Sequence, residues 1–576
     1  MATVYRIHPS VGVARVGNQQ GSSPQDFFIG PESPGHHPVP PGGYKRDGKI
    51  KRQGARFRIY EYETDPASGQ LRPVREINSD HATIRWTVRL ANTKAAGPRF
   101  PVVGAPVPRN ENISDPAERE RLLGLRKEES IESSDRGPRP LDDFFLDRNN
   151  TGTDAFRVHL GDLLTDDKGR LIVLGGYGKS FSPIGTPLDG PDSDTFNHDE
   201  WCDDTSDGII TAQITLNGAA NPVADRPTAR VIVGPPDYAP AIENVVSIYD
   251  IAEDIATRLP AASGPLPGPN QGTVSFARHI YPILKRVSQL HWVTTLADDA
   301  HAPGMQADYS RGDILSLLRD ANTSPASPAF RARNHVLRWL RVPIGSSATP
   351  TPDSSMPKLS RENDTGRPLT LTLLQFGRMV RWASGDFDPD AGVDLNAPAR
   401  PFEQITDVAE QTRALDRAGL DSTVGGSFYP GIEASRFMRE ESIWSAPLRV
   451  RDNVPAGALT EGMALPWQTD FLACRQTWWP ANRPGSVKRR DPQNPTSFLR
   501  SAWEPPTSTE SFTRIDWTKT AFVVQDGDAF VESERDEAPI VPAPPLESLG
   551  PGSARPRVSP PFNREDLIVN DEGGEA

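Results

Sequence analysis

Residues Ala55-Arg-Phe-Arg-Ile-Tyr-Glu-Tyr-Glu63 alternate polar and apolar side chains with a period of two. The alternation predicts a β-strand with one wet and one dry face, because successive side chains of a strand point to opposite faces of its sheet. Residues 83–90 repeat the pattern, and residues 171–178 and 229–236 are short apolar runs that end at glycine or proline. Antiparallel sheet is therefore the expected framework of an N-terminal domain over residues 1–265.

Two stretches break the strand pattern. Residues 110–147 are polar and highly charged, which predicts a long surface excursion, and Asp115 followed by proline predicts one short capped helix inside it. Residues 261–272 are rich in glycine and proline and are expected to connect the strand-rich part to a different kind of structure.

Helical periodicity begins after this connector. Residues 276–293, 329–342 and 370–383 carry apolar side chains three and four positions apart, which predicts a helical lobe over 273–386. Pro282 must kink the first of these helices or begin a new one. Short segments rich in glycine, aromatics and proline follow over 387–535, and a proline-rich acidic tail over 536–576 has too little apolar surface to fold by itself. The fold class is therefore predicted to be α+β, with an irregular, mixed C-terminal region.

Composition limits the classes of function. The chain has 576 residues, a formal net charge of -13, 58 prolines and two cysteines. The negative charge disfavours a nucleic-acid partner, and two distant cysteines without histidines at ligand spacing predict neither a disulfide framework nor a metal site. The N-terminus lacks a conventional signal peptide and no apolar run approaches 20 residues, so we expect cytoplasmic synthesis and no membrane span; export without a conventional signal stays open.

Residues 466–484 form the densest aromatic segment of the chain and contain Asp470 and Cys474. The two are four positions apart, so on a helical turn the carboxylate and the thiol share one face. The carboxylate would raise the thiol pKa, which argues against a simple thiolate nucleophile. Two readings remain at this point. Cys474 is an ordinary buried thiol, or its sulfur is bonded to an oxidised tryptophan ring.

Five motifs resemble one known family. Residues 7–18, 27–32, 47–60, 201–208 and 470–484 are similar, in this order, to the L-lysine epsilon-oxidase and glycine oxidase family of cysteine tryptophylquinone enzymes. The similarity recurs from residue 5 to about residue 535. The chain is therefore identified as a member of this family.

The resemblance implies the site residues. Cys474 matches the cofactor cysteine, and Asp470 matches the acidic residue needed for cofactor maturation and catalysis. The partner tryptophan is Trp517, on the resemblance of residues 516–535 to a family segment, with Trp503 as the alternative; Thr520 and Ala521 replace the usual Leu-Gly. Trp478 and Trp479 are expected to pack near the site.

Three further motifs bear on the pocket. Tyr429, in a glycine-rich stretch, stands where the family varies and where substrate choice is affected. It puts both lysine and glycine specificity in doubt, or it is an ordinary wall residue. Residues 203–208 are expected to cap backbone N–H groups, and Lys51, Arg52 and Arg56 are expected to form a packed polar layer.

The resemblance also implies a reaction. A small-molecule or peptidyl primary amine is oxidatively deaminated with dioxygen, giving an aldehyde or oxo acid, ammonia and hydrogen peroxide. A separate flavoprotein would mature the cofactor, and assembly as a homo-oligomer is left open. Two alternatives remain: a binding or scaffold protein that lacks the cofactor, and an amine dehydrogenase that passes electrons to a protein acceptor.

Overall fold

Strand β6 (Arg52–Thr64) holds together the large sheet of the computed structural model, because it pairs with five other strands, β1, β2, β3, β7 and β12. The structure describes residues 3–66, 69–98, 108–146, 155–182, 199–260, 266–343, 356–357, 369–425, 432–434, 436–469, 479–504 and 516–536. Within these residues the other strands of the sheet are β1 (Val4–His8), β2 (Val11–Arg15), β3 (Phe27–Ile29), β7 (Leu71–Ile77), β8 (Ala82–Asn92), β9 (Leu125–Glu132), β10 (Arg139–Leu146), β11 (Ala155–Thr165), β12 (Leu171–Gly175), β15 (Ser206–Leu216) and β16 (Thr228–Gly234).

The sheet is mixed, although the strand pattern predicted an antiparallel framework. Most neighbours are antiparallel, but β2 pairs with β16 in parallel and β3 pairs with β6 in parallel. The order along the sheet is β10-β11-β12-β6-β2-β16-β15-β8-β9. The pair β2–β16 joins strands from distant parts of the chain. Alternation within a strand carries no information on the direction of the neighbouring strand, so these pairings could not be predicted from the pattern.

The charged stretch over 110–147 is a second correction. It begins with the expected helix, α1 (Pro116–Leu123), capped by the Asp115 side chain, but its remainder supplies β9 and β10 of the main sheet rather than a surface excursion. Cross-strand ion pairs explain this, since Arg85 and Arg89 on the exposed face of β8 lie opposite Glu132 and Glu128 on β9.

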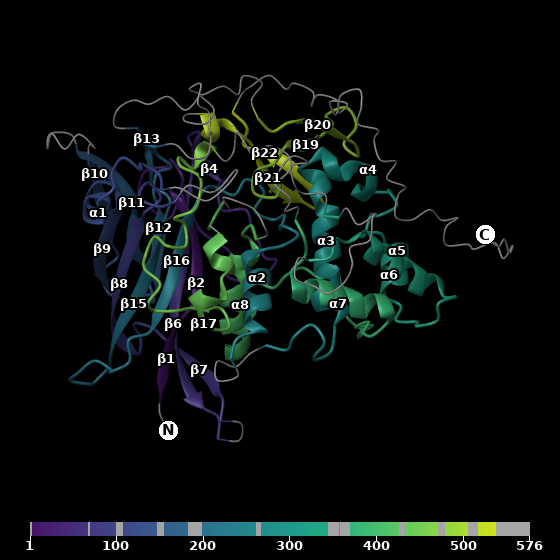
Figure 1. Ribbon diagram of the computed structural model, residues 1–576, viewed down its shortest axis with the longest axis horizontal. Helices are drawn as coiled ribbons and strands as arrows, with labels where there is room; N and C mark the ends of the chain where they lie inside the picture. Colours follow the sequence, from purple (N-terminus) through teal and green to yellow (C-terminus); the bar gives the residue numbers. More distant parts are fainter. Residues whose placement is uncertain are drawn as a thin grey trace.

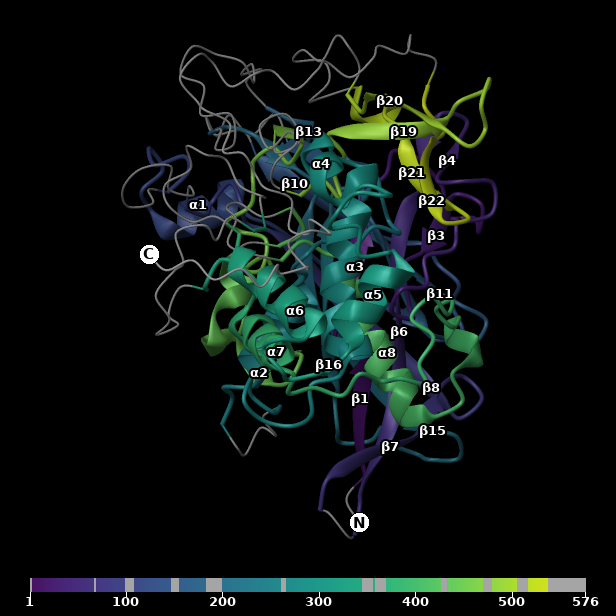
Figure 2. The same ribbon diagram turned by 90° about the vertical axis from the view of Figure 1, so that its right-hand side faces the viewer.

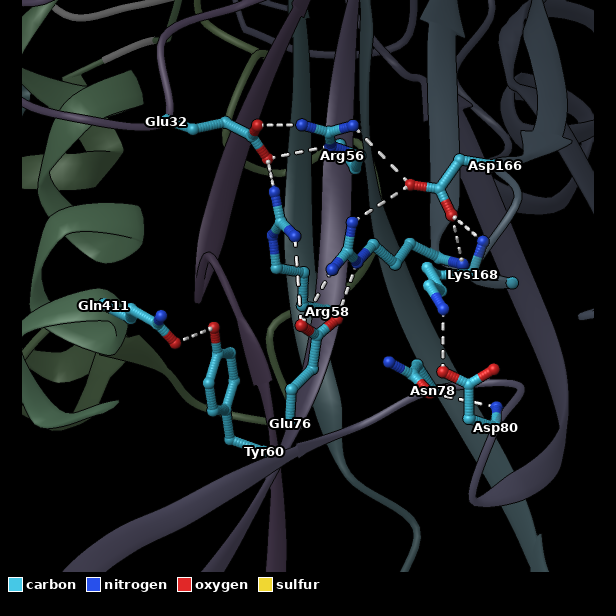
Figure 3. A network of polar contacts seen from close by, with 12 residues as sticks. Glu32, Arg56, Arg58, Tyr60, Glu76, Asn78, Asp80, Asp166, Lys168 and Gln411 are labelled. Atoms are coloured by element: carbon cyan, nitrogen blue, oxygen red, sulfur yellow. Dashed lines mark hydrogen bonds and ion pairs between the residues drawn. The ribbon is translucent and has the colours of Figure 1, made fainter. Parts of the chain in front are cut away.

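The polar face of β6 is buried rather than wet. Arg58 is 2% exposed, and the carboxylate of Glu32 binds both Arg58, at 2.9 Å, and Arg56 (Figure 3). Figure 3 also shows the network extending to Glu76, which pairs with Arg170 at 2.6 Å. Arg56 therefore belongs to a packed polar layer, as predicted, and so does the fully buried Arg52, which pairs with Asp162.

Apart from α1, which lies beside β9 and β10, the helices lie on one side of the sheet, with α2 and α8 nearest to it and α3, α5, α6 and α7 beyond them (Figures 1 and 2). Their bounds are α2 (Ile248–Ala256), α3 (Tyr281–Gln289), α4 (Asp298–His301), α5 (Gly312–Arg319), α6 (Pro328–Trp339), α7 (Leu373–Ser384) and α8 (Val408–Asp421). The predicted helices over 329–342 and 370–383 are confirmed as α6 and α7. Pro282 begins a new helix, because it occupies the first turn of α3 after the short turn Phe276–Ile280.

Short hairpins complete the described chain. They are β4 (Lys45–Arg46) with β5 (Lys49–Ile50), β13 (Ser180–Phe181) with β14 (Cys202–Asp203), β17 (Trp444–Ala446) with β18 (Arg449–Val450), β19 (Ser486–Arg490) with β20 (Phe498–Ala502), and β21 (Phe522–Asp526) with β22 (Ala529–Ser533). The hairpins β19–β20 and β21–β22 lie side by side at one end of the molecule (Figures 1 and 2). None of the helices in the described ranges has the length and apolar character needed to cross a bilayer.

Candidate active site

The indole of Trp517 is buried at the start of the last hairpin. Trp517 lies in the short turn Asp516–Lys519, just before β21, and is 3% exposed. Its carbonyl accepts a hydrogen bond of 2.7 Å from the hydroxyl of Tyr238. The ring of Trp467 meets the Trp517 ring edge to face, with 5.1 Å between centroids. Trp517 is thus fixed through its backbone by one aromatic residue and through its ring by another.

The six-membered ring of Trp517 faces the main chain of Gly178. A Cβ placed on Gly178 would lie 2.5 Å from Cζ2 and 2.6 Å from Cη2 of Trp517, and 3.5 Å from Cζ2 of Trp467. The φ of Gly178 is +72°, a conformation that other residues adopt only at a cost. Glycine is therefore required at position 178 for two reasons: its φ is positive, and the Trp517 ring leaves no space for a Cβ.

The segment that leads to Asp470 is anchored beside Trp517. The backbone N–H of Trp467 donates to Oδ2 of Asp203 at 2.9 Å, and the side chain of Gln468 donates to the Gly178 carbonyl at 3.0 Å. Asp203 is itself held by the ammonium of Lys94, and both are fully buried. Burial lowers the pKa of Lys94, and the Asp203 carboxylate opposes that shift. A buried ion pair thus orients the turn that ends at Thr469.

Asp470, Cys474 and Trp478 lie outside the described residues. Cys474 lies between Thr469 and Trp479, the described residues on either side. Their roles stay predictions.

The chain that follows Cys474 is described again from Trp479, and it is hydrogen-bonded to Tyr238 through Asn482. Trp479 is fully buried, and its carbonyl accepts the backbone N–H groups of Asn482 and Arg483 at 3.1 Å each. The carbonyl of Asn482 in turn accepts the backbone N–H of Tyr238 at 2.9 Å, and Tyr238 is the residue whose hydroxyl binds Trp517. Trp479 is therefore linked through Asn482 to Tyr238, which binds the Trp517 backbone.

Tyr429 also lies outside the described residues, but the ends of its loop are anchored. The carboxylate of Glu433, which is fully buried, accepts the backbone N–H of Val424 at 3.0 Å and the side-chain amide of Asn482 at 2.7 Å. Arg15 neutralises Glu433 at 3.0 Å. The described residues on either side of Tyr429, Val424 and Glu433, are therefore bonded to each other, and Glu433 also binds Asn482.

Trp503 has a complete structural role. Its indole N–H donates to the carbonyl of Ala521 at 2.8 Å, and its ring packs against Tyr238, with 4.8 Å between centroids, and against the guanidinium of Arg483 at 5.0 Å. These contacts give Trp503 a packing function, and they favour Trp517 for the proposed crosslink.

Sequence reasoning missed several residues that build the site. Gly178 was read only as the end of an apolar run. Tyr238 carried no signal, because Trp517 is 279 residues away, and neither did the pairing of Glu433 with Arg15, 418 residues away. The expectation that residues 203–208 cap backbone N–H groups is confirmed. Asp203 receives the N–H of Trp467, and Asp207 receives those of Gly457 and Thr460, each at 2.9 Å. Across the described ranges no cluster of three or more metal-binding side chains is present.

Comparisons with known proteins point to one family. Residues 8–233 match a family profile described as "L-Lysine epsilon oxidase N-terminal", and residues 351–493 match one described as "L-lysine epsilon oxidase C-terminal domain". The L-lysine 6-oxidase of Marinomonas mediterranea is 26% identical over 588 residues, which cover 86% of this chain and 74% of that protein.

Solved structures support the same fold. A crystal structure of the L-Lys epsilon-oxidase from Marinomonas mediterranea matches with a TM-score of 0.67 and 22% identity, covering 92% of this chain and 95% of that one. A structure described as the Schiff base intermediate of that enzyme with L-Lys matches equally well, with the same TM-score, identity and coverage.

Proposed function

Because the chain belongs to the L-lysine epsilon-oxidase family of amino acid oxidases, we propose that it is a quinoprotein oxidase. In this proposal it deaminates a primary amine or amino acid with dioxygen and releases an aldehyde or oxo acid, ammonia and hydrogen peroxide. The proposed cofactor is cysteine tryptophylquinone, formed within the chain from Cys474 and Trp517.

The observation that carries the proposal is the convergence of three segments on Trp517. The turn before Asp470 contacts its ring through Trp467, the segment after Trp478 reaches it through Asn482 and Tyr238, and Gly178 borders its six-membered ring. Cys474 lies between the first two segments in sequence. A thioether to Trp517 is therefore compatible with the described ends of the chain.

The residues present also fit a modified ring. Maturation requires three ring C–H groups and the thiol S–H to be replaced by one C–S bond and two carbonyl groups, with dioxygen as the oxidant. Gly178 places no side chain against Cζ2 and Cη2, which are adjacent carbons of the six-membered ring. The backbone of Trp517, held by Tyr238, keeps the ring in place while its edge changes.

Once formed, the quinone supplies an electrophilic carbonyl to which a primary amine adds. The side chains have separate tasks. Asp470 is proposed to remove the proton from the substrate carbon next to nitrogen, as a positioned carboxylate can. Trp467 and Trp479 are 1% and 0% exposed, and they exclude water from their side of the site.

The substrate is proposed only as a class. The relative is named for the oxidation of L-lysine, so lysine is the first amine to test, followed by glycine, other amino acids and lysyl peptides. Tyr429 is proposed to face this substrate. Glu433, four positions after it, binds Asn482, which is linked to Trp517 through Tyr238.

Intact mass tests the cofactor directly. The chain is co-expressed with a flavoprotein maturation partner, and its mass is compared with that of the chain expressed alone. Two added oxygens and four lost hydrogens give a gain of about 28 Da in the co-expressed protein. Peptide mapping should then show a thioether between the peptides that contain Cys474 and Trp517.

Matched variants locate the crosslink. Cys474→Ala and Trp517→Phe should both abolish the mass gain. Cys202→Ala and Trp503→Phe should both retain it, because Cys202 is buried in the sheet region and Trp503 is engaged in packing. A gain that survives Trp517→Phe and is lost in Trp503→Phe would move the cofactor to Trp503.

Peroxide release then separates the classes of enzyme. A matured chain that releases hydrogen peroxide from an amine under air is an oxidase. Amine turnover with an artificial electron acceptor and no peroxide would instead identify a dehydrogenase. A wild-type chain that never gains mass with the partner present would be a binding protein on the same fold.

A further inference from the structure

Asp204 is a buried carboxyl group whose side chain accepts a hydrogen bond from the loop bordering Trp517. It follows β14, next to Asp203, and is 1% exposed. Its Oδ2 accepts the backbone N–H of Lys179 at 3.1 Å. Its Oδ1 is buried and has no hydrogen-bond partner among the described residues. Burying a carboxyl costs free energy, so its retention here calls for a role.

The peptide unit between Gly178 and Lys179 is held at both of its polar atoms. Its N–H donates to Asp204, and its carbonyl accepts the side chain of Gln468 at 3.0 Å. Gln468 lies two residues before Asp470. One peptide plane therefore joins Asp204, the turn that precedes the proposed base, and the glycine that borders the Trp517 ring.

The preceding residues of this loop are packed equally closely. A Cβ on Gly176 would lie 2.6 Å from Oδ2 of Asp204 and 2.5 Å from the carbonyl of His159. The ring of Tyr177 stacks on that of His159, with 4.4 Å between centroids, and lies 4.8 Å from the guanidinium of Arg52. The loop thus rests on the sheet on one side and contacts Trp517 on the other.

We propose that Asp204 is a positioning residue of the Trp517 site, which holds the Gly178–Lys179 peptide so that Gly178 borders the ring edge where the cofactor forms. The inference about cofactor formation rests on the proposed function; the hold on the loop does not. A modified ring needs a defined space along Cζ2 and Cη2, and the position of Gly178 sets that space.

The pKa of Asp204 shows that burying this carboxyl is unfavourable, which is consistent with a positioning role. Burial raises the pKa of Asp204 to about 7, and the neighbouring carboxylate of Asp203 adds to the shift, while the Lys179 amide and His159 oppose it. Lys94 does not offset the cost for Asp204, because its ammonium is bound to Asp203. Ionised Asp204 therefore destabilises the folded protein. Asparagine would accept the same hydrogen bond without the charge.

Asp207 provides the matched comparison. It belongs to the same segment and is also fully buried, but its carboxylate binds the backbone N–H groups of Gly457 and Thr460 instead of the Gly178 loop. A variant at Asp207 therefore removes a buried carboxylate of the same region and leaves the contact with Lys179 intact.

The first measurement is amide hydrogen exchange in the unmatured chain, which does not depend on the cofactor. Asp204→Ala should speed exchange at the Lys179 amide about tenfold, the loss expected for one hydrogen bond to a carboxylate. Asp204→Asn should stay close to wild type, and so should Asp207→Asn. Unchanged exchange in Asp204→Ala would overturn the proposal.

The second measurement is the fraction of folded chain that gains about 28 Da when the maturation partner is supplied. Asp204→Ala should reduce this fraction about tenfold, because misplacement by about 1 Å can slow a reaction about 100-fold. Asp204→Asn should restore it, and Asp207→Asn should leave it at the wild-type level in folded material. Normal maturation of folded Asp204→Ala would overturn the positioning role, whereas a wild-type chain without the gain would overturn the proposed function and leave the exchange result standing.

Discussion

Replacing Gly178 with alanine tests the contact on which the site depends. Alanine places a Cβ 2.5 Å from Cζ2 of Trp517, closer than carbon atoms approach one another, so the ring or the loop has to move. Both are constrained, the ring by Trp467 and the loop by Asp204 and Gln468. The clash therefore cannot relax at the end of a flexible side chain.

Two terms set the magnitude. The φ of +72° costs alanine about 1–2 kcal/mol relative to glycine, and overpacking in a close-packed interior costs about 1–3 kcal/mol more. Gly178→Ala should therefore lower the free energy of unfolding by about 2–5 kcal/mol. Gly218→Ala isolates the first term, since Gly218 has a φ of +81° and no atom within 4 Å of an added Cβ.

Urea unfolding of the unmatured chain, followed by circular dichroism, measures both variants. The excess cost of Gly178→Ala over Gly218→Ala should be about 1–3 kcal/mol. Trp517→Phe removes the outer ring atoms, so combined with Gly178→Ala it should recover about 1–2 kcal/mol relative to additivity. Equal costs for the two glycine variants, with no coupling to Trp517, would refute the assigned contact.

Three further predictions concern the surroundings of the site. Between pH 4 and pH 7 the wild-type chain should lose about 3 kcal/mol of stability relative to Asp204→Asn. The reason is that the folded state keeps Asp204 protonated up to about pH 7, while the unfolded state ionises near 3.8; parallel pH curves of urea midpoints would contradict this. Lys94→Met should destabilise by about 3–5 kcal/mol, since it strands the buried Asp203 carboxylate, and adding Asp203→Asn should recover part of that loss in the same unfolding assay. Trp503→Phe should cost about 1–3 kcal/mol through the lost bond to Ala521 and the space left behind, yet mass spectrometry should still find the matured cofactor; loss of the gain in folded protein would instead assign Trp503 to the crosslink.

Local patterns predicted the regular elements well. The alternation over 55–63 and 83–90 lies within β6 and β8, and helical periodicity located α6 and α7, because both signals depend only on neighbouring residues. The same reasoning failed over 125–146, where acidic and basic side chains suggested a surface excursion. Those charges pair with arginines on β8, a strand about 40 residues earlier, so the pattern could not be read locally.

The burial of β6 shows the same limit at the level of side chains. Its alternation correctly separated two faces, but the polar face was expected to meet water. Glu32, which pairs with Arg56 and Arg58, and Glu76, which pairs with Arg58, come from other segments and allow that face to be buried. Period-two alternation identifies the faces of a strand and leaves open what covers each of them.

The motifs with Asp470 and Cys474, and the ordered resemblance over residues 5–535, were sufficient to identify the family from the sequence alone, and they made Trp517 the proposed partner of Cys474. Only the tertiary structure brought Gly178 and Tyr238 to that tryptophan, and Asp204 to the loop of Gly178. The physical reason is that the chemistry of a group depends on its own side chain. Its space and its hydrogen bonds depend also on residues more than 200 positions away, such as Gly178 and Tyr238, which only folding brings into contact with it.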